Sequence, residues 1–542
     1  MAQNRDFLIF NATVRTVDSR DSVAEAVLVS GGRIVAVGTE EQIRASAAPD
    51  TQLIDAGGRT VVPGFIDAHN HLSVAAFAPD SVDCSTPPLT TLDEVLEVVE
   101  KHCKTLPPGQ WVRGMGFHMS QIREQRNPTR HELDEAAPNN PFFLLDASCH
   151  AGYANSLALG EVGISAHSPQ PWGGEIEKDD KGEPTGILLE AASNPLHSAS
   201  WNSYAERDPD RAVELLHTKA REYVAVGLTG VGDAMVTAKA AELYRKADAA
   251  GKLPLTVQQL HHGDHFFAMQ DLRRYDIVEQ LKEPSSEMLR GGTLKVYVDR
   301  AYPDGPALDQ IHDGCTQHVG SSFYTKGEVL DLALRASDLG VNTAIHAMGS
   351  CAVDTVLDAY EAVRGRKGSD SVLRIEHAFV ADPRQGARMA DLGVDLVANP
   401  GLGYGWGGFF SMWRGENQPH LRVLPVRSMI DAGVRVSLAS DHPCGTFSPL
   451  EIMWTAVART DFQGLPVDAE EAITAAEALR AYTINAAHAS NRAAEEGSIE
   501  VGKRANLVVL DRDIVTCPVA DIRAAQVDMT FVDGRLVHER DR

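Results

Sequence analysis

Short apolar runs alternate with amphipathic segments through most of the chain, which is the pattern of a parallel α/β fold. Apolar residues recur at helical spacing in segments 238–250, 327–339, 352–363 and 425–432, which are predicted helices. Eight strand and helix units close naturally into a (β/α)8 TIM-type barrel, whose catalytic groups lie at the C-terminal ends of the strands. The predicted barrel strands are the one that ends at His69 and segments 228–233, 253–261, 293–299, 341–346, 373–377, 394–399 and 434–441.

The two ends of the chain predict a second, smaller unit made of β-strands. Short alternating strands separated by turn residues occur within residues 7–37 and again within residues 497–537. Chain termini commonly lie close together on a domain surface. We therefore expect a β-sandwich composed of residues 1–63 and 491–542, which flanks a barrel domain of residues 64–490.

A long insert separates the first two barrel strands. Roughly 155 residues lie between them, far more than one crossover needs. Segments 111–117 and 142–146 are predicted strands, and segment 93–103 is a predicted helix. We expect an inserted α/β subdomain, residues 80–200, that forms a lid over the barrel mouth.

Charge and composition favour a small-molecule substrate. The 542-residue chain has a formal net charge of −25, spread along its length, which disfavours nucleic acid or an anionic membrane surface as a partner. No stretch approaches the about 20 apolar residues of a membrane span, and the first residues lack a secretory apolar run, so we expect a cytoplasmic protein. Seven scattered cysteines predict neither a disulfide framework nor a thiolate zinc site. The sequence is compatible with a monomer or with a homodimer.

Two histidines at the end of the first barrel strand suggest a metal site. His69 and His71 point to the same face of an extended chain, so one cation could be bound by both rings. Such pairs also occur as hydrogen-bonded structural histidines at strand ends. Other potential ligands at the predicted strand ends favour the metal site, and these are Lys295, His346, His377 and Asp441.

Lys295 is an unusual residue for the lumen of a barrel. Strand alternation places it on the same face as Tyr297 and Asp299. Desolvation lowers the pKa of a lysine, and a neutral amine can capture carbon dioxide as a carbamate whose two oxygens bridge two metal ions. The alternatives are a snorkelling side chain or an ion pair with Asp299. For the other candidate ligands, the alternatives are a hydrogen-bonded core histidine and an aspartate at a helix N-cap.

The candidate residues belong to short motifs that occur in a specific order over nearly the whole chain. These motifs are residues 61–71, 128–130, 180–187, the strand of Lys295, His346, residues 374–377, 440–441 and 502–506. Together they resemble the amidohydrolase superfamily, and more narrowly the subgroup that contains N-substituted formamide deformylases. The chain departs from the family pattern at Gly232, Arg300, His442 and Asn506.

The resemblance implies a metal-bearing (β/α)8 barrel with a flanking β-sandwich that hydrolyses mostly C–N bonds. We expect zinc, either as two ions bridged by a carboxylated Lys295 or as one ion, although manganese, iron or cobalt suit the same donors. By resemblance, one metal is surrounded by His69, His71, Lys295 and Asp441, and the other by Lys295, His346 and His377.

The expected reaction is hydrolysis of an amide, N-formyl or N-acyl bond in a small apolar or aromatic substrate. Metal coordination lowers the pKa of water to about 7 and polarises the carbonyl. Asp441 is the expected catalytic residue, since it can take the proton of the water and pass it to the departing amine. A decarboxylase or an ester or carbon–carbon hydrolase could use the same barrel, and carbon dioxide release without water uptake would identify the former. A non-catalytic binding or regulatory protein would have lost ligands, whereas this chain retains the whole set.

Residues on the barrel strands and the lid are candidate substrate contacts. Tyr297 shares the lumen face with Lys295. His150 occupies a family position near substrate, with a structural histidine of the lid as the alternative. The third predicted strand ends in histidines that we expect in the pocket wall or in a solvated turn, and these are His261, His262 and His265.

The glycine-rich segment 399–413 is a second predicted lid. Glycine gives a loop mobility, and Trp406, Phe409 and Trp413 offer apolar, stackable surface to a substrate. Ordinary packing of these rings against the barrel rim is the alternative. If the segment faces the site, the substrate is apolar or aromatic.

Overall fold

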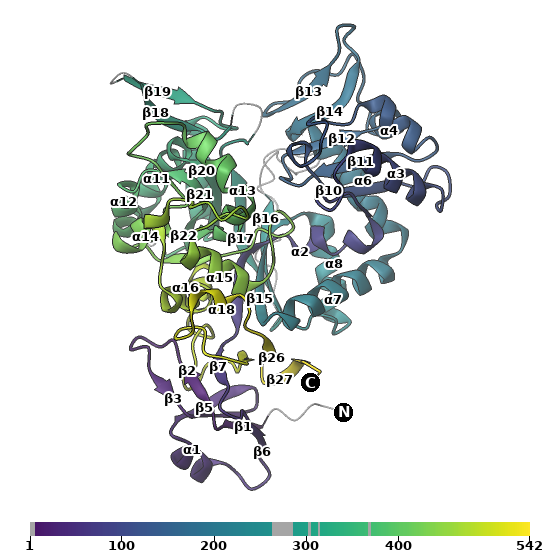
Figure 1. Ribbon diagram of the computed structural model, residues 1–542. Coiled ribbons are helices and arrows are strands. Elements are labelled where there is room, and N and C mark those ends of the chain that lie inside the picture. Colours follow the sequence, from purple (N-terminus) through teal and green to yellow (C-terminus); the bar gives the residue numbers. More distant parts are fainter. Residues whose placement is uncertain (1–5, 263–285, 302–304, 313–314, 367–369, 542) are drawn as a thin grey trace.

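A parallel barrel sheet forms the centre of the molecule in the computed structural model, which describes residues 6–262, 286–301, 305–312, 315–366 and 370–541 (Figure 1). Within these residues, eight parallel strands follow one another in the order β8, β15, β16, β17, β20, β21, β22 and β24. The predicted barrel is thus confirmed. The strands are β8 (Phe65–Asn70), β15 (Leu228–Val236), β16 (Thr256–His262), β17 (Leu289–Tyr297), β20 (Asn342–Gly349), β21 (Leu373–Ala381), β22 (Asp395–Ala398) and β24 (Val436–Leu438).

Hydrogen bonds just beyond the ends of β8 and β24 bring the first and last strands together. The backbone N–H of Asp441 donates to the carbonyl of His69 at 2.9 Å, and that of His71 donates to the carbonyl of His442 at 2.9 Å. The buried carboxylate of Asp67 accepts from the backbone N–H of Ser440 at 2.9 Å and from its hydroxyl at 2.5 Å. The segment that carries Asp441 is therefore held against the two histidines at the end of β8.

Amphipathic helices cover the outside of the barrel, as the apolar spacing predicts. In α10, Thr325 caps the N-terminus by accepting from the backbone N–H of Glu328, and Val329 and Leu332 are buried against the sheet. Among the described helices, none has the length and apolar character that a membrane crossing requires. The covering helices include α7 (Pro209–Ala225), α8 (Ala238–Ala249), α10 (Lys326–Asp338), α11 (Ser350–Arg364), α12 (Gln385–Leu392), α14 (Val426–Asp431), α15 (Pro449–Ala458) and α16 (Ala475–Ala481).

Two sheets lie below the barrel in Figure 1, and one of them combines strands from both ends of the chain. The ring of Phe7 stacks on that of Phe531 from the other end of the chain, with centroids 4.8 Å apart. One sheet has the order β5 (Arg33–Gly38), β4 (Ala26–Ser30), β1 (Phe7–Phe10), β6 (Gln52–Asp55). The other has the order β27 (Arg535–Glu539), β26 (Val527–Val532), β25 (Leu507–Leu510), β7 (Thr60–Pro63), β2 (Thr13–Arg15), β3 (Val23–Ala24).

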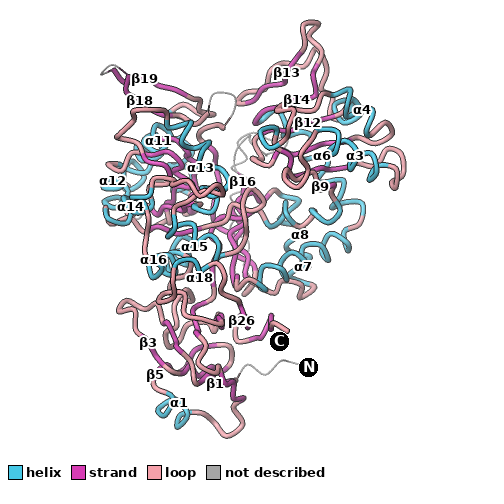
Figure 2. Tube along the Cα trace, viewed as in Figure 1, coloured by secondary structure: helices cyan, strands magenta, loops and turns pink. Residues whose placement is uncertain are grey.

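The insert between β8 and β15 forms its own sheet with helices beside it, to the upper right of the barrel in Figures 1 and 2. Its apolar core includes Val95, Val112 and Leu144, which come from a helix and two strands as predicted. The helices are α3 (Leu92–Cys103), α4 (Arg130–Ala136), α5 (Ser156–Glu161) and α6 (Asn194–Arg207). The sheet has the order β13 (Gly174–Lys178), β14 (Pro184–Glu190), β12 (Ala151–Ala154), β11 (Phe142–Asp146), β10 (Val112–Phe117), β9 (Val82–Asp83).

The prediction of a mobile loop over 399–413 is wrong, because this segment is the helix α13 (Pro400–Arg414). Pro400 is near the N-terminus of the helix, where its missing N–H costs nothing. The glycines allow close packing: a Cβ on Gly407 would lie 2.5 Å from Cγ2 of Val467, and one on Gly401 would lie 2.8 Å from Cγ1 of Ile452. Glycine here lets the helix approach its neighbours and does not provide mobility.

Replacement of Gly232 by alanine should destabilise the barrel. A Cβ at Gly232, in β15, would lie 2.3 Å from the backbone oxygen of Ala68 in β8, which cannot move without disturbing the strand. Overpacking of this kind costs about 1–3 kcal/mol. The midpoint of denaturant unfolding should therefore fall for Gly232→Ala. The control is Gly327→Ala, since a Cβ there meets nothing within 4 Å. Equal midpoints for the Gly232 variant and the wild type would contradict this expectation.

Candidate active site

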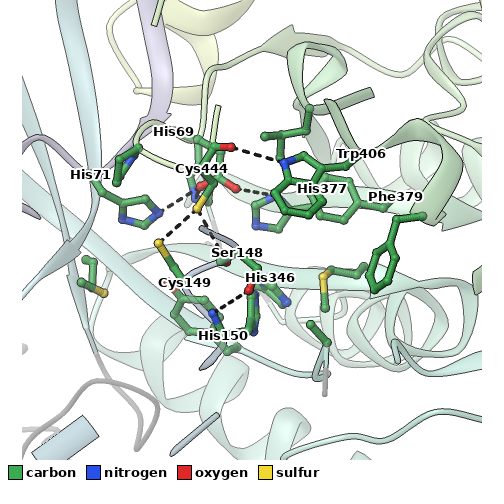
Figure 3. Close-up of a pocket in the computed structure, with 18 of the residues that line it drawn as sticks. His69, His71, Ser148, Cys149, His150, His346, His377, Phe379, Trp406 and Cys444 are labelled. Carbon is green, nitrogen blue, oxygen red and sulfur yellow. Dashed lines mark hydrogen bonds and ion pairs between the residues drawn. The ribbon is translucent and has the colours of Figure 1, made fainter. Parts of the chain in front are cut away.

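A cavity lies at the C-terminal ends of the barrel strands, where the insert and α13 meet the barrel, and its empty space is about 860 Å³ when the part open to solvent is included (Figure 3). Its walls come from barrel strands, from the insert and from α13, so segments far apart in the sequence share it. The lining residues are His69, His71, Val74, Leu145, Ser148, Cys149, His150, His197, Met235, Tyr297, Ala301, His346, Met348, His377, Phe379, Leu402, Trp406, Phe409, Phe410, Trp413, Asp441, Pro443 and Cys444.

His69, His71 and Asp441 form a compact group of potential metal ligands. Ligand atoms of these three buried residues all lie within 4.8 Å of one another. Oδ1 of Asp441 is 3.0 Å from Nε2 of His71 and 3.4 Å from Nε2 of His69. The first two side chains project from the end of β8, and the third from the segment after β24. This arrangement is suited to a divalent cation.

His346 and His377 lie beside this group. The rings of His377 and His69 have centroids 4.7 Å apart, and those of His377 and His346 have centroids 4.6 Å apart. Lys295 is fully buried, with Nζ 4.1 Å from the ring centroid of Tyr297. Among the described residues, Lys295 is the one predicted site residue that does not line the cavity. The other predicted site residues, His150, Tyr297, Trp406, Phe409 and Trp413, do line it.

The buried carboxylate of Glu376 orients the His69 ring, a role that sequence reasoning missed. It contacts Nδ1 of His69, which leaves Nε2 directed at Asp441. Arg374 donates to both oxygens of Glu376, at 2.5 Å and 2.9 Å, and its positive charge balances the negative charge of the carboxylate. Burial opposes ionisation, but the Arg374 guanidinium holds the pKa of Glu376 well below its usual range. Carboxylates that fix the far nitrogen of a histidine are typical partners of metal-binding imidazoles.

Asn399 plays the corresponding role for His377. Its Oδ1 lies 2.8 Å from Nδ1 of the ring, at the end of β22. A polar residue at the C-terminal end of a predicted barrel strand was the available sequence signal. Two of the candidate ligands have strained backbone conformations: φ is 79° at His377 and 55° at Asp441, in the left-handed region that L-residues rarely adopt. Such strain is typical of functional sites held by their surroundings.

The protonation states suit a metal site. Burial lowers the pKa of His71, His346 and His377, which favours neutral imidazoles. Burial alone would raise the pKa of Asp441, but its interactions with His69 and His71 hold it well below its usual value. Within the described structure, Nδ1 of His71 and Nε2 of His346 are buried without a hydrogen-bond partner. Neutral imidazoles with unused nitrogens, next to an ionised carboxylate, fit a divalent metal.

Aromatic rings form an apolar wall of the cavity, which adjoins His377 through Phe379. Phe379 of β21 stacks on Phe410 of α13, with centroids 4.5 Å apart. Phe409 packs against Trp413 at 4.7 Å, and Nε1 of Trp406 donates to the carbonyl of Cys444 at 3.4 Å. The segment 399–413 therefore does face the site, although as a helix. Its rings give the cavity an apolar wall, and Figure 3 shows Trp406 of this wall beside His377.

The insert contributes His150 to the cavity. Its ring lies 5.9 Å from that of His346 between centroids, and Nδ1 is 2.9 Å from Oε2 of Glu190. Burial alone would lower the pKa of His150, but the Glu190 carboxylate raises it. The expectation that the histidines after the third strand line the pocket or a solvated turn is wrong for His261 and His262, which are buried and, within the described structure, outside the cavity wall. His265 lies outside the described residues.

Residues 52–538 match the model of a family described as the amidohydrolase family, and residues 26–47 match an imidazolonepropionase-like composite domain. The chain is 71% identical over 540 residues to an N-substituted formamide deformylase of Arthrobacter pascens, covering 100% of this chain and 99% of that one. An uncharacterized metal-dependent hydrolase from Pyrococcus horikoshii has a similar fold, with a TM-score of 0.71, 21% identity, and coverage of 95% and 99% of the two chains. One from Pyrococcus furiosus gives 0.70 and 23% identity, covering 94% and 100%.

Proposed function

Since this chain belongs to the amidohydrolase family and is a hydrolase of C–N bonds other than peptide bonds, we propose that it removes the formyl group from formamides whose nitrogen bears an apolar or aromatic substituent. The proposal rests on one observation, which is that a single cavity is lined both by potential metal ligands and by aromatic side chains. A cluster of buried imidazoles with Asp441 adjoins a wall of aromatic side chains. The full-length similarity to an N-substituted formamide deformylase supports the formyl group as the part that is cleaved.

We propose zinc as the cofactor, in a two-ion centre bridged by a carboxylated Lys295. When bound, the metal would supply Lewis acidity, which lowers the pKa of water and polarises a carbonyl group. The proposed ligands of the first ion are His69, His71, Lys295 and Asp441, and those of the second are Lys295, His346 and His377. Their support is the proximity of the donors and the unpaired Nε2 of His346.

Asp441 is the proposed catalytic residue. Its carboxylate lies beside His71 and His69 at the centre of the donor cluster, and it is ionised because these groups lower its pKa. An ionised carboxylate there can accept the proton of the attacking water. It can then return the proton to the amine nitrogen, since an amide anion is too basic to depart unprotonated. The strained backbone at Asp441 directs this side chain into the cavity.

The aromatic wall is the proposed binding surface for the N-substituent. Trp406, Phe409 and Trp413 present ring faces and edges that a flat apolar group could stack on. His150 and Tyr297 lie across the cavity, near His346, where the carbonyl end of the substrate would sit. We also propose that residues 80–200 act as the lid that supplies His150 to a barrel of residues 64–490, with residues 1–63 and 491–542 as the flanking sandwich.

A panel of N-substituted amides tests the proposal. Formate and amine should be released in equal amounts from N-formyl compounds, with kcat/KM higher for N-benzyl and N-phenyl than for N-methyl formamide. N-acetyl analogues serve as the comparison for the formyl group. If acetyl compounds are cleaved as well as formyl ones, the proposed deformylase specificity is wrong. If no amide releases an amine, the hydrolytic proposal itself fails.

Trp406→Ala should lower kcat/KM for an N-benzyl formamide by about 10- to 100-fold, the value of a buried aromatic contact. It should change kcat/KM for N-methyl formamide little, because that substrate does not reach the aromatic wall. Met412→Ala is a matched control on the same helix, since Met412 is 62% exposed on its outer face. An equal loss for both substrates would show that Trp406 maintains the fold of the site and does not bind the substituent.

A further inference from the structure

Glu190 is a fully buried carboxylate that joins the insert to the barrel next to the cavity. Its side chain has 0% exposure. Oε2 lies 2.9 Å from Nδ1 of His150, and Oε1 accepts from the backbone N–H of Ala301 at 2.7 Å. His150 and Ala301 both line the cavity, whereas Glu190 lies behind its wall. Burying a charged group is costly unless it is well hydrogen-bonded, so a carboxylate at this position indicates a specific role.

The backbone of Glu190 is also strained. Its φ of 51° and ψ of −129° lie outside the regions that non-glycine residues normally adopt. The conformation is held by the ladder between β12 and β14, which ends with Ala151 opposite Leu189, and by the N–H of Glu190, which donates to the carbonyl of His150 at 2.8 Å. Strain of this kind persists when surrounding contacts over-determine it, and it is concentrated at functional sites. Here it turns the side chain of Glu190 back toward His150.

We propose that Glu190 is a positioning residue, which holds the His150 imidazole against the cavity with Nδ1 protonated and the Nε2 edge turned toward the substrate carbonyl. The inference rests on the proposed deformylase function for the identity of the substrate. The orientation of the His150 ring is inferred from the contacts of Glu190 alone. The bond from the backbone N–H of Ala301 to Oε1 holds the carboxylate in place, so that Oε2 stays directed at His150.

The chemistry of the contact explains why a carboxylate is needed. A carboxylate accepts hydrogen bonds only, so it selects the ring form that carries a proton on Nδ1. The amide of glutamine would instead offer its N–H group to Nδ1, since its oxygen is needed by the N–H of Ala301. Nδ1 would then have to lose its proton, and the ring would present the opposite tautomer to the cavity. Glu190→Gln thus preserves shape and changes the form of His150.

The test compares Glu190→Gln, Glu190→Asp, His150→Ala and the double variant His150→Ala with Glu190→Gln, each in the full-length protein. Glu132→Gln is the control for loss of an insert carboxylate, since Glu132 caps α4 away from the cavity. Three measurements are made on each: steady-state kinetics with an N-benzyl formamide for kcat and KM, thermal unfolding for the midpoint, and the ¹⁵N imidazole spectrum of histidine-labelled protein. The His150 signal is the one that disappears in His150→Ala.

Glu190→Gln should lower kcat by about 10- to 100-fold, as expected for loss of a hydrogen bond to a charged group, with a smaller change in KM. The ¹⁵N spectrum should show His150 protonated at Nδ1 in the wild type and not in Glu190→Gln. Glu190→Asp keeps the charge but shortens the side chain, so its kcat should lie between those of the wild type and Glu190→Gln. The double variant should be no slower than His150→Ala, because Glu190 acts through His150.

Wild-type kcat in Glu190→Gln, or an unchanged His150 spectrum, would overturn the inference. So would additive losses in the double variant, which would mean that Glu190 supports the fold independently of His150. Failure of the proposed function has a separate signature: a wild-type protein that cleaves no amide. In that case the ¹⁵N spectra still decide whether Glu190 sets the form of His150.

Discussion

Asp441→Asn should reduce kcat for an N-substituted formamide by about 10²- to 10⁴-fold, the range of general acid–base catalysis. Asparagine has nearly the same shape and retains an oxygen that can face His71, but it cannot accept the proton of the attacking water at neutral pH. The loss should therefore fall on kcat, while the thermal midpoint and the metal content per chain change little. Steady-state kinetics, thermal unfolding and elemental analysis of the same preparations check the three parts of this expectation.

Asp382→Asn is the matched control for Asp441→Asn. Both aspartates are 8% exposed and lie beyond the ends of barrel strands. Asp382 binds Arg384 and the N–H of Arg384, and it is not part of the cavity wall. Its replacement should lower stability and leave kcat unchanged. Near-native turnover in Asp441→Asn would show that another group carries the proton, and a loss of metal would show that Asp441 acts mainly as a ligand.

The barrel and most residues of the site could be predicted because they follow from local periodicity. Strand alternation and the repeated strand and helix pattern place the ends of parallel strands at one rim, whatever the loops do. His69, His346 and Asp441 each terminate a predicted strand, so their convergence needs no knowledge of side-chain packing. A barrel of this kind brings residues more than 300 positions apart within reach of one another.

The partners of these residues could not be predicted, because they depend on contacts between distant segments. Glu376 meets His69 across 307 positions of the chain, and Glu190 meets Ala301 across 111. Nothing in the local pattern distinguishes such a carboxylate from one on the surface. The helix α13 was missed for a different reason, since its glycines are poor helix formers in isolation. Packing against Val467 and Ile452 outweighs that preference in the folded protein.

The cavity combines contributions that the fold brings from separate units. Barrel strands supply the imidazoles and Asp441, the insert supplies His150 with Glu190 behind it, and α13 supplies the aromatic rings. Loops and inserts can change while the strand ends stay fixed, which is how barrels of one type act on many substrates. Substrate choice in this chain should therefore depend on α13 and the insert, and the hydrolytic step on the strand ends.

Lys295→Ala should lower the metal content from two ions per chain to one or fewer, and kcat should fall by at least about 10²-fold, as expected for loss of a group that stabilises reacting charge. Lys295 is fully buried, in a position where its charge would act on the neighbouring His346 and His377. A buried ammonium next to metal ions is unfavourable. A carbamate formed from the neutral amine and carbon dioxide, with release of a proton, replaces that cation by an anion with two ligand oxygens.

Elemental analysis of protein grown with and without added bicarbonate measures the metal content per chain. ¹³C spectra of protein prepared in ¹³C-bicarbonate detect the carbamate carbon directly. The wild type should show that signal and Lys295→Ala should lack it. Lys178→Ala is the control, because the Lys178 ammonium is only partly buried and donates to the carbonyls of Ala166 and Ser168 in the insert. The contradicting result is a metal content of one ion per chain that changes neither with bicarbonate nor in Lys295→Ala. The protein would then be a mononuclear hydrolase, in which His69, His71 and Asp441 hold the ion. Lys295 would be a structural residue of the lumen.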